Sequence, residues 1–222
     1  MCGRFTLAID QFELEGEFES TQIPATYVAR YNIAPSQPIL AITNAEPAVA
    51  DFLVWGMIPS WAKDPSIGSR LINARAETLA EKPAFRSSYK YKRCIIPADG
   101  FYEWKAVPGT RTKVPHFIRL RSARPFGLAG LWSEWRSADG SELRTCSIVT
   151  TVPNSLMEPI HNRMPVILDR EARGVWLDPS PRAPNQLQPL LVPYPAEEMI
   201  AFPVSTRVNS PANDDADCIQ PG

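Results

Sequence analysis

Signals for metal binding and for membrane insertion are missing from this 222-residue chain. Its four cysteines include no CxxC pair, and only two histidines could join them, so no recognisable zinc pattern is present. No apolar run approaches the roughly 20 residues of a membrane span, and the first residues lack the apolar core of a signal peptide. We therefore expect a cytoplasmic protein with reduced thiols, no cofactor, no metal and no membrane partner.

A large excess of charge of one sign is also missing, because the formal net charge is −1. This value argues against a protein that coats nucleic acid indiscriminately, since such binding depends on many cations. The charges are nevertheless segregated: between Arg70 and Arg93, seven basic residues accompany only two acidic ones, and acidic residues gather near both ends. This pattern suits a polyanion bound on one face, and a solvated charged surface is the alternative.

Apolar stretches separated by turn residues dominate the chain and predict strands. The expected strands cover residues 39–42, 48–55, 93–96, 116–120, 126–132, 143–151 and 166–168. Helical patterns are fewer, at residues 11–18 and from an N-cap at Asp169 to Leu177, and the proline-rich segment 179–195 predicts a surface excursion with at most one short helix.

Consecutive strands with few helices between them predict an α+β fold. In this fold a mainly antiparallel sheet would curl towards a barrel, with helices at its margin. We expect one domain over residues 1–222, ending in an acidic polar tail from about residue 209.

The start of the chain carries the first candidate for chemistry. Methionine aminopeptidases remove Met1 before small residues, so the mature chain would begin with the thiol and the α-amine of Cys2. An amine pKa of about 8 leaves about a tenth of the amine neutral at pH 7, able to form an imine with an aldehyde. The thiol could then close a thiazolidine, with an effective molarity of about 10⁵ M or more. Burial of an ordinary cysteine is the alternative, and a side chain sealed in the core would contradict the hypothesis.

Polar residues follow an apolar pair in segment 71–78, inside the basic stretch. Asn73 offers a neutral donor and acceptor there, and Arg75 offers a planar fork suited to phosphate. The alternative is a strand end followed by a helix that carries exposed charge.

Two further residues could transfer protons. Glu103 stands between Tyr102 and Trp104, and partial desolvation would raise the pKa of its carboxyl, whereas simple alternation would point it at solvent. His161 lies in a proline-bounded loop, a common place for catalytic groups, although it could only brace a turn. His116, within a strand, is expected to be structural.

Two tryptophans differ in their expected exposure. Trp55 lies on a predicted strand and should be buried. Trp61 lies beyond Pro59 in a loop, where its ring could stack on unpaired bases with about 1–3 kcal/mol per base.

Together these segments resemble the SRAP family of abasic site processing proteins, of the YedK and HMCES type. The resemblance is carried by residues 1–5, 31–35, 55–56, 59–61 and 73–78, by Gly100 with Glu103 and Trp104, and by His161 with residues 163–165. Residues 203–205 and 219–221 also fit, so matches follow one another along nearly the whole chain. Each match is weak alone, but their joint order and the position of Cys2 make the resemblance specific.

The resemblance implies an α+β fold with a barrel-like sheet and a positively charged channel that leads single-stranded DNA to Cys2. It assigns Cys2 the crosslink to the ring-opened aldehyde of an abasic deoxyribose, and Asn73 the orientation of the sugar or the N-terminus. Glu103 would transfer protons during imine formation and ring closure. His161 would act on the sugar hydroxyl and in reversal or lyase chemistry. Asn162 departs from the family, where an acidic residue can occur, and leaves the tuning of His161 open.

The implied partner is single-stranded DNA containing abasic sites, with duplex accepted on one side at a junction. The DNA-binding residues that the resemblance implies are Arg4, Pro35, Trp61, Arg75 and Arg163. We expect a monomer that joins the nucleoid when bound to damaged DNA.

Two other functions are compatible with these residues. A thiol peptidase, acting on other proteins or on its own initiator bond, would use Cys2 with Glu103 and His161, and would require a thiolate and an oxyanion hole. A noncovalent single-strand binder would retain no DNA after denaturation.

Overall fold

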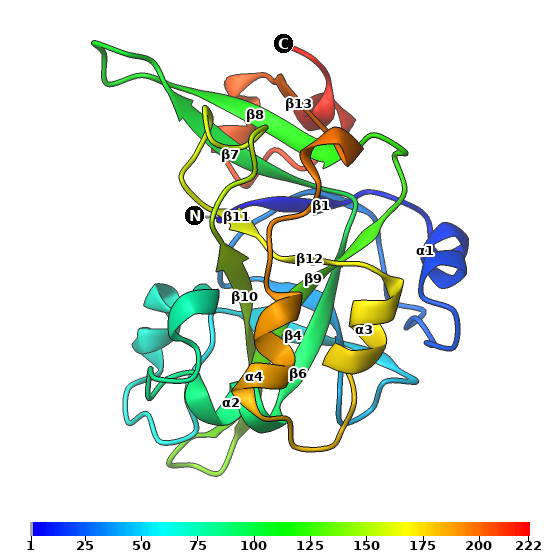
Figure 1. Ribbon diagram of the computed structural model, residues 1–222, viewed down its shortest axis with the longest axis vertical. Coiled ribbons are helices and arrows are strands. Elements are labelled where there is room, and N and C mark those ends of the chain that lie inside the picture. Colours follow the sequence, from blue (N-terminus) through cyan, green and yellow to red (C-terminus); the bar gives the residue numbers. More distant parts are fainter. Residues whose placement is uncertain (1) are drawn as a thin grey trace.

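The computed structural model describes residues 2–222, in which a closed barrel lies below an antiparallel sheet (Figure 1). The barrel contains β3 (Pro38–Thr43), β4 (Ala50–Trp55), β6 (Arg93–Ala98), β9 (Phe126–Arg136) and β10 (Glu142–Thr151). Because β9 pairs with both β6 and β10, the order β10-β4-β3-β6-β9 closes into a ring. Three short strands extend it: β5 (Asn73–Arg75) and β11 (Met164–Pro165) on β10, and β12 (Ile167–Leu168) on β9.

One parallel pair interrupts the antiparallel pattern of the ring. β4 runs parallel to β10, and the other four ring pairs are antiparallel. A ring with an odd number of strands requires such a pair, because direction cannot alternate around five members. The prediction of a mainly antiparallel, barrel-like sheet in an α+β domain is confirmed.

The second sheet has five antiparallel strands in the order β13-β8-β7-β1-β2. Its members are β1 (Phe5–Leu7), β2 (Arg30–Ile33), β7 (Gly100–Ala106), β8 (Lys113–Leu120) and β13 (Met199–Pro203). One face contributes Phe101 and Ile118 to the main hydrophobic core, and the other packs Tyr102 and Phe117 on Val208 of the C-terminal segment. Alternate residues of β7 therefore face two different cores.

Short helices lie at the margin of the barrel, as expected (Figure 1). The α-helices are α1 (Gln11–Glu17), α2 (Arg86–Tyr91), α3 (Arg170–Trp176) and α4 (Pro184–Leu187). The 3₁₀ segments are Pro65–Arg70, Ala76–Thr78, Gln188–Leu190, Ala196–Glu198, Thr206–Asn209 and Ala216–Ile219. Asp169 caps α3 by accepting from the Ala172 N–H, so the predicted helix start is confirmed. None of the helices in the described part of the chain is long and apolar enough to cross a membrane.

All seven predicted strands occur, with boundaries shifted by a few residues. The sequence patterns did not predict the short strands β1, β2, β5, β11 and β13, because segments of two to five residues contain too few positions to show a period.

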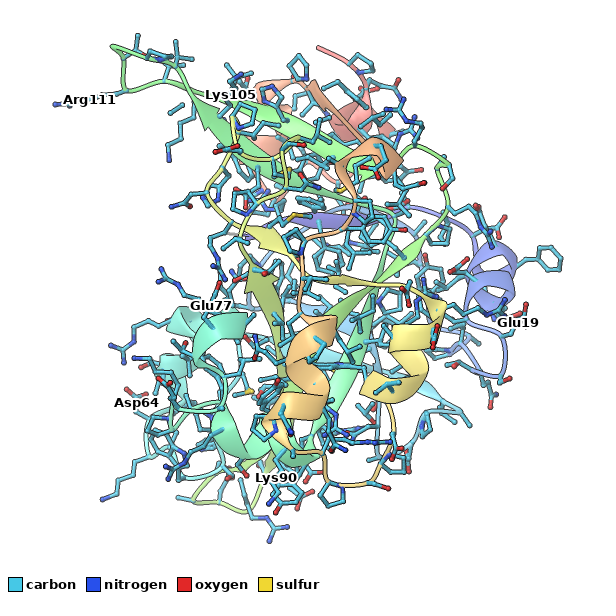
Figure 2. All side chains as sticks on the ribbon, viewed as in Figure 1. Glu19, Asp64, Glu77, Lys90, Lys105 and Arg111 are labelled. Carbon is cyan, nitrogen blue, oxygen red and sulfur yellow. The ribbon has the colours of Figure 1, made fainter. Side chains whose placement is uncertain are left out.

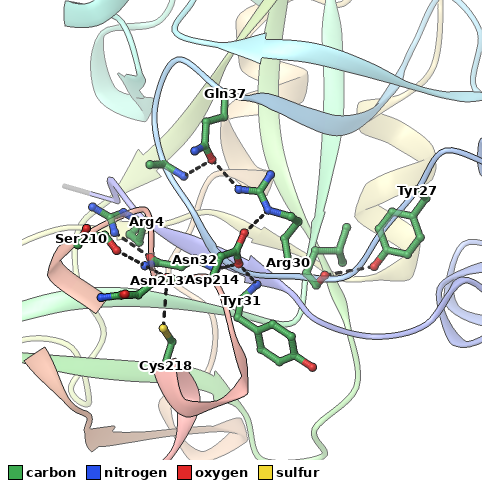
Figure 3. Close-up of polar contacts among 12 residues, drawn as sticks. Arg4, Tyr27, Arg30, Tyr31, Asn32, Gln37, Ser210, Asn213, Asp214 and Cys218 are labelled. Carbon is green, nitrogen blue, oxygen red and sulfur yellow. Dashed lines mark hydrogen bonds and ion pairs between the residues drawn. The ribbon is translucent and has the colours of Figure 1, made fainter. Parts of the chain in front are cut away.

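The C-terminal segment, residues 205–222, differs from the solvated acidic tail that its composition suggests (Figure 3). The Asp214 carboxylate accepts from the backbone N–H groups of Tyr31 and Asn32, at 2.6 and 2.8 Å, and pairs with Arg30. The buried Asn32 amide donates to the carbonyl groups of three residues of this segment, Val208, Ser210 and Asn213. The segment is therefore folded onto β2, because its polar groups satisfy buried ones.

Candidate active site

The candidate site lies where the barrel meets the second sheet. At the carboxyl end of β10, β5 pairs on one side and β11 on the other, which brings Asn73 close to the loop that contains His161. In the second sheet, Phe5 lies opposite Phe101, so the chain before β1 runs beside Glu103 on β7. Four sequence-predicted groups thus come from four separate segments.

A close approach of two backbones positions the segment that leads into β5. Gly56 has φ +132°, and a Cβ there would lie 2.8 Å from the carbonyl oxygen of Gly68. Only glycine fits both requirements. Trp55, buried as predicted, donates through Nε1 to the carbonyl of Ile72 at 2.8 Å and so fixes the residue before Asn73.

Asn73 contacts the backbone of the predicted nucleophile. Its Nδ2 donates to the Cys2 carbonyl at 2.8 Å, and its buried Oδ1 has no hydrogen-bond partner within residues 2–222. The Cys2 side chain is fully buried and belongs to the main hydrophobic core, so the alternative of a buried cysteine holds in the described state. Burial raises the pKa of the Cys2 thiol well above its ordinary value, and the Glu103 carboxylate acts in the same direction. This environment holds the sulfur as a protonated thiol at neutral pH.

Glu103 and His161 face each other, with Oε2 and Nε2 3.9 Å apart. Glu103 is 2% exposed, and burial raises the pKa of its carboxyl. The neighbouring strand places His116 opposite Glu103, where its Nδ1 contacts the carbonyl of Val114. Simple alternation towards solvent, the alternative for Glu103, does not occur.

The loop around His161 orients the imidazole through Nδ1. This atom lies 3.0 Å from the backbone nitrogen of Arg163 and 3.2 Å from its carbonyl oxygen, so that Nε2 faces Glu103. Burial lowers the pKa of His161, and the ring is neutral near pH 7. Glu103 and His161 can therefore exchange a proton with a group held between them.

The profile of the family described as SOS response associated peptidase (SRAP) matches residues 1–211 of this chain. The chain belongs to the SRAP family. It is 49% identical to the abasic site processing protein YoaM of Bacillus subtilis, over 99% of this chain and 97% of that protein. It is 29% identical to the abasic site processing protein HMCES of Rattus norvegicus, over 100% of this chain and 76% of that protein.

A solved SRAP-like structure supports the fold assignment. The crystal structure of a protein from Bacteroides thetaiotaomicron superimposes with a TM-score of 0.89 at 28% identity and covers 100% of both chains. The barrel and the accompanying sheet are therefore features of the SRAP fold.

Two of the arginines expected to bind DNA in this SRAP protein have partners within the fold. Arg163 donates to both carboxylate oxygens of Glu77, at 2.6 and 2.9 Å, and to the carbonyl of Thr150 at 2.6 Å. Arg4 donates to Asn32 Oδ1 at 2.7 Å and to the carbonyl of Val208 at 2.6 Å (Figure 3). In the described state, both guanidinium groups stabilise the loops and strands around the site.

The remaining predicted DNA contacts are more accessible. Arg75 is exposed on β5, two residues beyond Asn73. Trp61 is 59% exposed in a loop that Trp135 fixes by donating to the Ala62 carbonyl at 2.7 Å. Pro35 is half-buried in the turn after β2.

The basic stretch between residues 70 and 93 does not form one continuous face. Arg93 is fully buried, and its guanidinium donates to five carbonyl groups, which include those of Trp176, Lys90 and Asp178. Figure 2 shows Lys90 near the lower end of the molecule and Glu77 higher, on its left side. Counting charges along the sequence therefore overstated the local cationic surface, because arginine can also bind carbonyl groups in the interior.

Sequence reasoning missed Thr150 as a residue of this site. It is fully buried at the end of β10, where it accepts from Arg163 and lies opposite Arg75 in the β5 pairing. No local motif marks this threonine, since its role depends on strand pairing. Within residues 2–222, the structure contains no group of three or more His, Cys, Asp or Glu side chains able to hold a metal ion.

Proposed function

We propose that this SRAP protein processes abasic sites in single-stranded DNA by forming a thiazolidine crosslink through Cys2 after removal of Met1. The supporting observation is the convergence of Cys2, Asn73, Glu103 and His161 at one junction of the two sheets. The relatives named as abasic site processing proteins supply the substrate class. We expect the protein to act as a monomer on single strands and on junctions with duplex, and to accompany damaged DNA.

The first chemical step is imine formation. The α-amine of Cys2 adds to the C1′ aldehyde of the ring-opened deoxyribose, and the resulting carbinolamine loses water. Glu103, whose raised pKa favours its protonated form, donates the proton that lets hydroxide leave as water. Asn73 holds the Cys2 carbonyl during this step and so limits the orientations of the amine.

The second step closes the five-membered ring. The Cys2 sulfur adds to the carbon of the protonated imine, the C=N π electrons go to nitrogen, and the thiol proton passes to the Glu103 carboxylate left by the first step, which restores its protonated form. Aldehyde and aminothiol thus give thiazolidine and one water. His161, whose Nε2 faces Glu103, is placed to contact a hydroxyl of the open sugar.

Access to the sulfur is the condition on which this proposal depends. Cys2 has no exposed surface in the chain that still contains Met1, while Asn73 and His161 beside it are half-buried. Removal of the first residue, with small movements of these two side chains, must admit the aldehyde. A thiol reagent should modify Cys2 in the native mature protein, as measured by intact mass; complete protection from the reagent would contradict the proposal.

The direct test is denaturing electrophoresis with intact mass after incubation with a single strand that contains one abasic site. We expect a shifted species for the wild type, with the mass of protein plus DNA minus one water, and none for Cys2→Ala. Cys146→Ala is the matched control, because Cys146 is also fully buried but lies in the barrel. A covalent species that persists in Cys2→Ala without reductant would overturn the assignment.

The role of the amine can be tested separately from that of the thiol. Cys2→Ala still exposes an α-amine after Met1 removal, so borohydride should trap its imine as a stable secondary amine. An alanine inserted between Met1 and Cys2 should abolish the crosslink that forms without borohydride, because the sulfur no longer shares a residue with the terminal amine.

A thiol peptidase is the second candidate, favoured by the family description. The raised pKa of Cys2 disfavours the thiolate that such a peptidase needs. Hydrolysis of a peptide substrate that requires Cys2 and persists after acetylation of the terminal amine would favour the peptidase.

A further inference from the structure

The β7–β8 hairpin carries a cluster of cations that the proposed chemistry does not use. Residues 104–115 form the end of β7, the turn and the start of β8, and they project beyond the body of the molecule (Figure 1). Lys105, Arg111 and Lys113 are all exposed, and no acidic residue occurs between positions 104 and 115. The cluster is therefore a positive surface with a defined backbone support.

This hairpin begins at the candidate site. Glu103 immediately precedes it, and the strand register continues with Lys105 opposite Val114. The charge of Lys113 acts electrostatically on both proton-transfer residues. It opposes the rise in the pKa of Glu103 and contributes to the lowered pKa of His161. Beyond Glu103, the last three residues of β7 extend about 10 Å towards the turn, enough to reach phosphates next to the lesion.

The hairpin cations are not neutralised as other exposed cations are. In the part of the chain that the structure describes, none of the three forms an ion pair, whereas Arg124 pairs with Glu17 and Arg170 pairs with Glu19. Figure 2 places Lys105 and Arg111 on the opposite side of the molecule from Glu19. Exposed cations without an ion-pair partner attract a polyanion and stay hydrated until it binds.

We propose that the β7–β8 hairpin binds the phosphodiester backbone of the DNA strand that flanks the abasic nucleotide. The inference rests on the proposed function for the position of the lesion, and it adds a second binding element to that site. Its contacts are electrostatic and independent of sequence, since lysine and arginine side chains there would bind phosphates rather than bases.

The test compares Lys105→Gln/Arg111→Gln/Lys113→Gln with the unchanged hairpin, both in a Cys2→Ala background that allows equilibrium binding. Affinity for a fluorescent single strand is measured from 50 to 300 mM salt. Three lost phosphate contacts should reduce the slope of log K against log salt by about 2 and weaken binding at low salt by about tenfold or more. The control, Arg121→Gln/Arg124→Gln/Arg170→Gln, removes the same charge from the α1 and α3 side, and it should leave the slope within error of the parent.

A second experiment locates the flank. Oligonucleotides that carry nucleotides only on the 5′ side or only on the 3′ side of the abasic site are compared with a strand extended on both sides. The hairpin substitutions should weaken binding of one truncated strand as much as that of the full strand, and should have no effect on the other.

The outcomes separate this inference from the proposed function. A wild type that crosslinks abasic DNA while the hairpin variant keeps the parent slope would overturn the hairpin assignment alone. A wild type that forms no crosslink while the hairpin variant still loses salt-dependent binding would overturn the crosslink and support the hairpin. Equal slopes in hairpin and control variants would show that only net charge matters, and would also overturn it.

Discussion

At the scale of single residues, the site is defined by two groups whose pKa values are displaced in opposite directions. Burial favours the neutral form of both, so it raises the pKa of Glu103 and lowers that of His161. The shifts favour a protonated carboxyl and a neutral imidazole, and their Oε2 and Nε2 atoms lie 3.9 Å apart, so two proton-transfer groups meet at one place. Sequence alone placed both residues among the candidates but gave no direction for these shifts.

Glu103→Gln should slow crosslinking by about 10²- to 10⁴-fold, because the proton donor for loss of water is removed. As pH rises from 5 to 9, the crosslinking rate of the wild type should decline because Glu103 ionises. The rate of the variant should not show this decline. Glu142→Gln is a control carboxylate far from the proton path, exposed at the start of β10 and paired with Arg136, and should keep that decline. An unchanged rate for Glu103→Gln would rule out its role in proton transfer.

The same substitution should have a pH-dependent effect on the free energy of unfolding. The folded-state pKa of Glu103 lies above its unfolded value, so wild-type stability falls as pH rises from the unfolded towards the folded pKa. Below the unfolded pKa both states hold the proton, and no contribution remains. Urea unfolding gives the free energy of unfolding of Glu103→Gln minus that of the wild type. This difference should be more favourable to the variant at pH 8 than at pH 4, and a difference that does not change with pH would contradict the raised pKa.

Arg163 is a positioning residue for His161 in the described state. Arg163→Lys keeps the charge but cannot form the bidentate contact with Glu77 together with the bond to Thr150. We expect saturating crosslinking rates to fall about 10- to 100-fold and the pH profile of His161 to shift, with little change in DNA affinity. Weaker affinity with an unchanged saturating rate would instead support the phosphate contact that the sequence suggested.

At the scale of elements, the C-terminal segment 205–222 stabilises the two strands that precede the site. Asn32 on β2 connects Arg4, next to β1, with the carbonyl groups of Val208, Ser210 and Asn213 (Figure 3). Composition suggested a solvated tail, but Asp214 satisfies two backbone donors of β2. The position of Cys2 is therefore coupled to residues more than 200 positions away.

Asn32→Ala should lower the free energy of unfolding by about 3 kcal/mol or more, because it leaves several buried polar groups without partners. Asn209→Ala is the matched control: Asn209 is exposed and accepts one bond from Trp104, so the loss should stay below about 1 kcal/mol. Urea unfolding measures both values. Equal losses would show that the Asn32 contacts contribute little.

At the scale of the whole molecule, closure of the barrel depends on close contact between β6 and β9. A Cβ at Gly130 would lie 2.7 Å from Cys94 Sγ and 2.9 Å from Ile96 Cδ1. The single parallel pair between β4 and β10 completes the ring. The barrel then supplies a rigid support for β5 and β11, whose positions bring Asn73 and His161 together.

Gly130→Ala should overpack this contact and lower the free energy of unfolding by about 1–3 kcal/mol. Gly174→Ala is the control, because a Cβ at this α3 position meets nothing within 4 Å, and alanine there should stabilise the protein by about 0.5–1 kcal/mol. Thermal unfolding midpoints should therefore move in opposite directions. A Gly130→Ala protein as stable as wild type would show that the β6–β9 contact can relax.

The strong local patterns were sufficient to predict much of this fold. Runs of apolar residues located the long strands, and Asp169 marked a helix start. The order of motifs from Cys2 to His161 identified the family and the four candidate site residues. The short strands and the Thr150 contact could not be predicted, because they depend on pairing between segments far apart in the chain.

By itself, the sequence determined the chemical groups: a cysteine that becomes terminal when Met1 is removed, a carboxyl among aromatics, and one histidine in a loop. Only the tertiary structure decided the state of these groups. Strand pairing sets which side chains lose water, and desolvation then raises the pKa of Glu103 and lowers that of His161. The same pairing encloses Arg93 among carbonyl groups and leaves Lys105 and Arg111 exposed. The sequence could not distinguish these residues, because the charge of a side chain says nothing about its surroundings.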